Sequence, residues 1–407
     1  MARFAIKLFV SALALGMFTL AASTAQADFT PVAGWDHQLF PSFLISSATI
    51  RLPEDAEPAD DALLGDRQGV LGVKVQSPAE GTQVTVTISC EAIMEPSSIT
   101  VTLDEADTEY AIFPRAKFNY AALAQNKQSM PVTITYQVEI DGEESDEQSA
   151  TVTLRSINDC PYTLYDGEGN ATDISYVFAA YVNEQHPFVD KVLRETLNGG
   201  IVDSFTGYQS KDEGEVYRQV YALWDTLSRR DVRYSNITTS VATSNAVSSQ
   251  HVRLIDESIN NSQANCVDGS VLMASLLRKI DIEPILVYVP GHCYLGFYLD
   301  HDCTKLVGLE TTLIGASSDD CPREIKGAGE IVDEQQRQSD SWATFCAAVV
   351  IGNKDLAHNK AHFDAHNDAN YQLVSIAKAR RIGILPIAFD SSSEFTPSQD
   401  SGASENE

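Results

Sequence analysis

The chain has 407 residues, with 57 acidic against 28 basic side chains and a formal net charge of −29 at pH 7. A charge of this sign and size repels nucleic-acid phosphates and anionic membrane surfaces, so neither is expected as a partner. The length is enough for two or three domains.

The first 27 residues have the pattern of a secretory signal peptide. Arg3 and Lys7 supply a basic start, an apolar run follows from Leu8 to Leu20, and Ala25-Gln26-Ala27 is an A-x-A cleavage signal. The apolar run is short for a bilayer span, and an uncleaved anchor is the alternative interpretation. We expect an exported protein, periplasmic or extracellular, with no membrane span. Cleavage would remove two basic residues and leave 380 residues with a net charge of −31.

Seven cysteines remain in the mature chain, and an oxidising compartment favours their pairing. Cys266 is the thiol expected to stay free. The predicted disulfides, the first two from spacing and the third by elimination, are Cys90–Cys160, Cys303–Cys321 and Cys293–Cys346.

Residues 28–65 are rich in proline and acidic side chains and are expected to form an extended lead-in. From 66 to 160, short runs such as 83–90 and 132–140 alternate apolar and polar residues with the period of half-buried strands. Asp141-Gly142 adds a turn signal. These features predict an antiparallel, immunoglobulin-like β-sandwich over 66–160, which would serve as a binding or spacing module.

After Cys160-Pro161 the pattern becomes helical, with apolar side chains three and four residues apart around 187–197 and 216–227. We therefore assign residues 161–389 to a second domain of mixed helices and strands. Past Phe389 the chain is rich in Ser, Asp and Glu without an apolar period, so 390–407 are predicted to be a disordered acidic tail.

The segment from Asn265 to Thr312 contains the residues expected for thiol chemistry. Cys266 precedes a run that is apolar nearly all round, which predicts a buried helix. A helix start favours the thiolate, and its N–H groups can form part of an oxyanion hole. The strands that follow open at His292 and end at Glu310, so all three side chains can meet across one cleft. The imidazole would deprotonate the thiol, and the carboxylate would hold the imidazole tautomer.

Three motifs stand in this order along the segment: Asn265-Cys266-x-Asp268, Pro290-Gly291-His292-x-x-Leu295-Gly296 and Glu310-Thr311-Thr312. Together they resemble the transglutaminase-like superfamily of papain-like cysteine hydrolases, in particular a bacterial exported branch. The resemblance is close over 260–315 and looser over 175–385. It implies an α+β fold in which a buried helix packs on an antiparallel sheet. It also implies acyl transfer through a cysteine thioester, by peptide-bond cleavage, glutamine deamidation or amide cross-linking.

The chain departs from the family pattern at two positions. The family usually has Asp as the third member of the triad, where this chain has Glu310, and often has Trp two residues after the histidine, where it has Tyr294. Taken alone, Cys266 is explained as an inert buried cysteine, and only its order and spacing with His292 and Glu310 favour chemistry. Asp268 is interpreted as a first-turn helix residue rather than a catalyst. A binding or scaffold protein that retains the fold without turnover stays open as the alternative.

No metal ligand and no cofactor are predicted. His358, His362 and His366 recur every four residues, which would suit a transition metal, but a polar helix face is the commoner explanation. Residues 166–172 resemble a calcium loop without its glycine at the sixth position or its glutamate at the twelfth. A protein or peptide amide is the expected substrate, and no pattern indicates an oligomeric state.

Overall fold

The computed structural model describes residues 28–50, 61–145, 147–236, 244–326, 328 and 330–398. The predicted signal peptide and its cleavage site therefore lie outside the described residues, as do 399–407 of the predicted tail. The protein is mixed α+β and divides into two units. The first comprises the described residues within 28–45, 61–174 and 244–250, and the second those within 46–50, 175–236 and 251–398. Within these ranges no helix is long and apolar enough to span a membrane.

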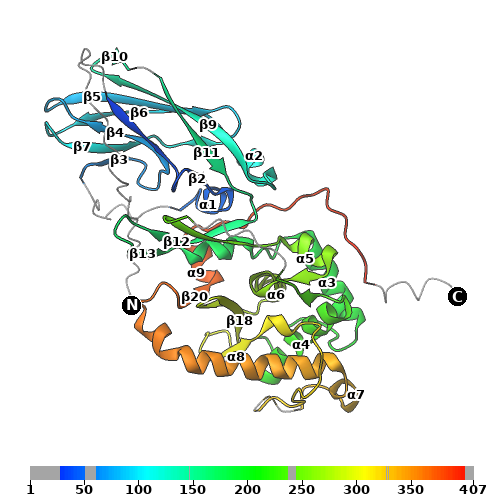
Figure 1. Ribbon diagram of the computed structural model, residues 1–407. Coiled ribbons are helices and arrows are strands. Elements are labelled where there is room, and N and C mark those ends of the chain that lie inside the picture. Colours follow the sequence, from blue (N-terminus) through cyan, green and yellow to red (C-terminus); the bar gives the residue numbers. More distant parts are fainter. Residues whose placement is uncertain are drawn as a thin grey trace. The chain divides into compact units, whose positions relative to one another are not determined.

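The first unit consists mainly of antiparallel strands arranged in two large sheets (Figure 1). A four-stranded sheet has the order β1-β4-β7-β3, and a larger sheet has the order β2-β11-β9-β5-β6-β8, with β10 paired to β9. Two short helices, α1 (Pro41–Ser46) and α2 (Tyr120–Gln125), accompany them. The strands are β1 (Phe29–Ala33), β2 (Gln38–Leu39), β3 (Leu63–Gly65), β4 (Leu71–Gln76), β5 (Thr82–Cys90), β6 (Met94–Leu103), β7 (Glu109–Phe113), β8 (Lys117–Phe118), β9 (Met130–Ile140), β10 (Glu143–Glu144) and β11 (Gln148–Leu154).

Side-chain alternation explains why these strands pack in layers. On β5, Val84, Val86 and Ile88 are fully buried while the residues between them are partly exposed, as the period of two requires. Tyr136 of β9 is also buried, and its hydroxyl donates to the carbonyl of Val32 in the smaller sheet over 3.1 Å. The two sheets therefore share one interior.

Strand structure begins earlier and ends later than the sequence predicts. The expected extended lead-in contains β1, which pairs with β4 along its whole length and buries Phe29. At the other end, β12 (Asp159–Tyr165) runs through Cys160-Pro161 and lies between β13 (Ala171–Asp173) and β15 (Val247–His251). The first unit consequently continues to Ile174, because β12 pairs with the neighbouring β13 and also with β15, a strand distant in sequence.

The second unit contains the predicted buried helix, α6 (Cys266–Lys279), and a sheet of order β19-β18-β17-β20. The strands β17, β18 and β19 are antiparallel, as predicted. They span β17 (Pro284–Val289), β18 (His292–Tyr298), β19 (Leu306–Leu309) and β20 (Gln372–Ser375). The remaining elements are η1 (Ser175–Tyr181), α3 (Pro187–Asn198), α4 (Glu213–Arg229), β14 (Arg233–Tyr234), α5 (Ile255–Asn261), β16 (Gln263–Ala264), η2 (Thr311–Leu313), α7 (Glu334–Arg337), α8 (Asp340–Ala365) and α9 (Ile376–Arg381).

Helices cover both faces of this sheet (Figure 1). On one side α6 packs against β17 and β18, and its residues from Val267 to Leu277 are all buried, which accounts for their apolar composition. On the other side, Phe363 of α8 joins a core cluster with Val287 and Tyr294. The sheet thus lies between α6 and α8.

The chain after Phe389 packs against helices of the second unit. The ring of Phe395 lies 5.1 Å from Phe188 of α3, and the guanidinium of Arg230 lies 4.5 Å from its centre. Ser393 donates to the carboxylate of Asp256 on α5 over 2.7 Å. Residues 390–398 therefore do not form the free tail that their composition predicts. Phe395 packs against Phe188 and Arg230, and amino-acid composition alone does not predict such a contact.

The disulfide predictions are wrong: all seven cysteines lie in the described ranges, and all have free thiols. Cys90 ends β5 of the larger sheet, whereas Cys160 is buried in β12 of another sheet. Cys303 is exposed in the turn after β18, and Cys321 is partly exposed in a later loop. Disulfide pairing depends on the distance between two cysteines in space, which their spacing along the chain does not give.

We expect the purified protein, unfolded in guanidinium chloride without reductant, to react with seven equivalents of a disulfide reagent such as Ellman's reagent. In the native state the exposed thiol of Cys303 should be accessible to the reagent, with a rate that rises with pH because its pKa is raised by partial burial and nearby carboxylates, whereas the buried thiols of Cys90 and Cys160 should be protected. Five or fewer thiols in the unfolded chain would contradict the structure.

Candidate active site

Cys266 stands at the first position of α6 and is partly exposed. The side chain of the preceding residue, Asn265, caps the helix by accepting from the N–H groups of Val267 and Asp268, both over 2.9 Å. Asp268 accepts in return from the Asn265 N–H over 2.9 Å, which completes a capping box. The helix start, and with it the cysteine, is therefore fixed by local bonds.

Asp268 is also the fully buried half of an ion pair. Its two carboxylate oxygens accept from the N–H and the guanidinium of Arg253, over 2.8 and 2.7 Å. Burial raises the pKa of Asp268 above its ordinary value, although the bonds to Asn265 and Arg253 act in the opposite direction. The interpretation of Asp268 as a first-turn helix residue is confirmed, and its partner Arg253 ties the segment before α5 to the helix.

His292 opens β18 and meets Glu310 immediately after β19. The imidazole Nε2 lies 2.7 Å from Oε2 of Glu310. The other carboxylate oxygen accepts from the N–H of Thr312 over 3.1 Å and from its hydroxyl over 2.6 Å. Burial alone would raise the pKa of Glu310, but the bonds from His292 and Thr312 outweigh burial and lower that pKa below its ordinary value. Glu310 is therefore a buried carboxylate that keeps its charge.

The imidazole is held between this carboxylate and the cysteine. The nearby thiol of Cys266, followed by the bond with Glu310, raises the pKa of His292 to about 10 against the opposing effect of burial. Because Nε2 faces the carboxylate, Nδ1 is the ring nitrogen left for the sulfur. The three predicted site residues thus lie together in the structure.

A second set of bonds joins the helix of the cysteine to the segment of the glutamate. The Ser270 hydroxyl lies 2.9 Å from the hydroxyl of Thr311, the residue after Glu310, and 2.7 Å from the carbonyl of Cys266. A Cβ added at Gly269 would lie 3.4 Å from Thr311, so α6 and η2 are in close contact here. Cys266 and Glu310 are therefore linked through bonds that do not involve His292.

Two tyrosines complete the surroundings. The buried ring of Tyr294 lies 6.0 Å from that of His292 at an interplanar angle of 26°, so it backs the imidazole. Tyr234 is 48% exposed and sits on β14, which pairs with Ala264 just before the cysteine. Burial, followed by the charges of Cys266 and Glu310, raises the pKa of Tyr234. Sequence reasoning missed Tyr234, because a two-residue strand distant from the motifs leaves no periodic signal.

Two of the residues considered as metal ligands have structural partners. The ring of His362 stacks on Tyr371 with centroids 4.1 Å apart. The carboxylate of Asp166 accepts from the N–H groups of Glu168 and Asn170, over 2.9 and 2.8 Å, and closes a tight loop. Across the described ranges, no group of three or more His, Cys, Asp or Glu side chains could hold a metal ion.

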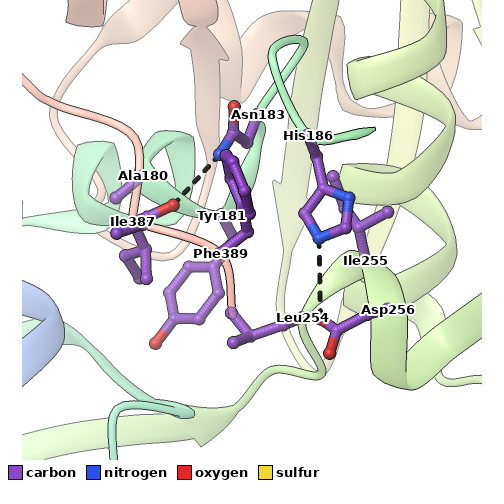
Figure 2. A pocket seen from close by; sticks show the side chains of 10 residues that line it. Ala180, Tyr181, Asn183, His186, Leu254, Ile255, Asp256, Ile387 and Phe389 are labelled. Atoms are coloured by element: carbon purple, nitrogen blue, oxygen red, sulfur yellow. Dashed lines mark hydrogen bonds and ion pairs between the residues drawn. The ribbon is translucent and has the colours of Figure 1, made fainter. Parts of the chain in front are cut away.

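A separate pocket, with about 230 Å³ of empty space partly open to solvent, lies beside the C-terminal segment (Figure 2). His186 caps α3 by accepting from the Phe188 N–H over 3.1 Å, and its Nε2 faces Asp256 at 3.7 Å. Asn183 donates to the carbonyl of Ile387 over 3.1 Å. Figure 2 shows Phe389 beside these groups. The pocket contains none of the three clustered site residues, and its polar groups support the packing of the C-terminal segment.

A scan of known protein families finds no family model that matches this chain, and a search of curated proteins finds no match either. The function must therefore be argued from the residues and the geometry of the site.

Replacing Arg253 by Met should lower the free energy of unfolding by about 3–5 kcal/mol, because Asp268 would remain buried without its cation. Urea unfolding at pH 7 measures this loss. Arg233→Met is the matched control, since Arg233 pairs with Asp231 at an exposed site, where ion pairs contribute little. Equal losses in the two variants would contradict the assigned role of Arg253.

Proposed function

We propose that this chain is a transglutaminase-like cysteine enzyme that transfers acyl groups from protein or peptide amides. The observation that carries the proposal is the imidazole of His292, held between Cys266 and the charged carboxylate of Glu310 with its pKa raised to about 10. A buried helix that begins at the cysteine and packs on an antiparallel sheet supports a papain-like core. Export is proposed from the pattern of residues 1–27.

The first chemical step follows from the charges at the site. An imidazolium beside the sulfur favours the thiolate of Cys266, which attacks the carbonyl carbon of the substrate amide. The sulfur–carbon bond forms, the carbon–nitrogen bond breaks, and the proton on Nδ1 of His292 passes to the departing amine nitrogen. The carboxylate of Glu310 keeps the ring oriented throughout.

The helix start supplies a donor for the oxyanion that forms during this attack. The side chain of Asn265 occupies the N–H groups of Val267 and Asp268, which leaves the N–H of Cys266 at the first helical position. A backbone N–H at that position is suited to a developing negative charge on the carbonyl oxygen.

In the second step the neutral imidazole accepts a proton from the incoming nucleophile as it attacks the thioester. Water gives hydrolysis, whereas a substrate amine gives cross-linking. The side chain of His292 is 31% exposed, so water reaches the ring, and we propose hydrolysis as the outcome. The thiolate of Cys266 then leaves with the sulfur–carbon bond electrons and restores the ion pair.

Iodoacetamide labelling followed by peptide mass spectrometry tests the activation of the thiol. At pH 6 only about 0.3% of an ordinary thiol is ionised. We expect Cys266 to react more than about tenfold faster at this pH than Cys303, an exposed thiol on the same chain whose pKa is raised by partial burial and by nearby carboxylates. His292→Ala should lower the rate of Cys266 relative to that of Cys303 about tenfold, and Glu310→Gln should lower it less.

Acyl transfer itself is tested with p-nitrophenyl acetate as the acyl donor. Mass spectrometry measures how fast the acetylated Cys266 peptide forms and how fast it disappears. The enzyme should acquire and lose the acetyl group, and His292→Ala should slow both steps. If Cys266 labels no faster than Cys303 in the unmodified protein and in His292→Ala, the chain is instead a scaffold that retains the fold without turnover.

A further inference from the structure

The strand that leads to Glu310 lies at the edge of its sheet. In the order β19-β18-β17-β20, one side of β19 pairs with β18, and its opposite side faces α8. Two successive outward N–H groups are satisfied by that helix. The N–H of Gly308 donates to the side-chain oxygen of Asn353 over 3.0 Å, and the N–H of Glu310 donates to the carbonyl of Ala348 over 3.0 Å. The helix therefore takes the place of a neighbouring strand.

The contact between helix and strand is a close backbone crossing. A Cβ built on Gly308 would lie 2.3 Å from the backbone of Gly352, and one built on Gly352 would lie 2.4 Å from Gly308. Neither glycine has room for a side chain, so the two backbones touch. The position of β19 is consequently set by α8 as well as by the sheet.

Asn353 has a role in this crossing that helix propensity does not explain. Asparagine is an unfavourable residue in a helix interior, and Asn353 is exposed, so it contributes little to the core. Its amide oxygen reaches across to Gly308, two residues before Glu310. The side chain thus acts on the end of the strand from which the glutamate projects toward His292.

We propose that Asn353 is a positioning residue for the acyl transfer proposed above, on which this inference rests. It holds the end of β19 so that the carboxylate of Glu310 meets Nε2 of His292 at 2.7 Å. Displacing a catalytic group by about 1 Å is enough to lower a rate by roughly 10²-fold. A bond that holds the edge of β19 therefore acts on the charge and orientation of the imidazole without touching it.

The test compares three variants by the ratio of Cys266 to Cys303 labelling with iodoacetamide between pH 5.5 and 9. Asn353→Ala should lower the ratio at pH 6 about three- to tenfold and move the pH profile toward that of His292→Ala. Asn353→Asp keeps an oxygen for the Gly308 N–H and should restore the ratio. Asn359→Ala is the matched control, because Asn359 lies on the same helix and donates to Asp355 of that helix.

Circular dichroism and thermal unfolding establish that each variant is folded. If Asn353→Ala loses its fold, Asn353→Gln, which moves the amide oxygen by one methylene, carries the same expectations. A folded Asn353→Ala with the ratio and pH profile of the unmodified protein would overturn the inference while leaving the proposed function standing. An equal loss in Asn359→Ala would also overturn it, because general loosening of α8 would then explain the effect. If the unmodified protein shows no preference for Cys266, the proposed function and this inference both fail.

Discussion

The hydrogen bond between Nε2 of His292 and Oε2 of Glu310 is the interaction on which the site depends. A carboxylate as buried as Glu310 would tend to lose its charge, since burial disfavours the ionised form. Two bonds from Thr312, together with the bond from the imidazole, reverse that tendency. The retained charge then stabilises the imidazolium of His292, whose pKa is raised. In the mechanism proposed above, this cation would in turn stabilise a thiolate at Cys266.

Several sets of bonds hold the site, and most of them join segments that are distant in sequence. The capping box of Asn265 and Asp268 sets the start of α6, and Arg253 fixes it from a segment earlier in the chain. The Ser270–Thr311 bond joins α6 to the segment of Glu310. The crossing of α8 over β19 holds the edge strand on its open side. The sheet between α6 and α8 therefore helps to fix the distances between Cys266, His292 and Glu310.

The parts of the fold that follow from local pattern could be predicted from the sequence. The apolar run after Cys266 predicted a buried helix, and apolar runs bounded by turn residues predicted β17 to β19 and their antiparallel order, because each signal lies within a few residues. The disulfides could not be predicted, since spacing along the chain does not say which cysteines share a sheet. Tyr234 and the packing of Phe395 were missed for a related reason, because both depend on partners distant in sequence. The proximity of His292 to Glu310 could be predicted from the order of the motifs. The contact of α8 with the edge of β19 could not, because it joins residues 308 and 352.

The protonation of the His292 ring is the quantity that tests this account most directly. Nitrogen-15 NMR of the imidazole reports it without reference to turnover. Because a raised pKa favours the charged form, the ring should stay doubly protonated through neutral pH and lose its proton near pH 10. In Glu310→Gln the midpoint should fall, since the neutral amide no longer stabilises the cation. A midpoint near the ordinary value of about 6.5 in the unmodified protein would contradict the account.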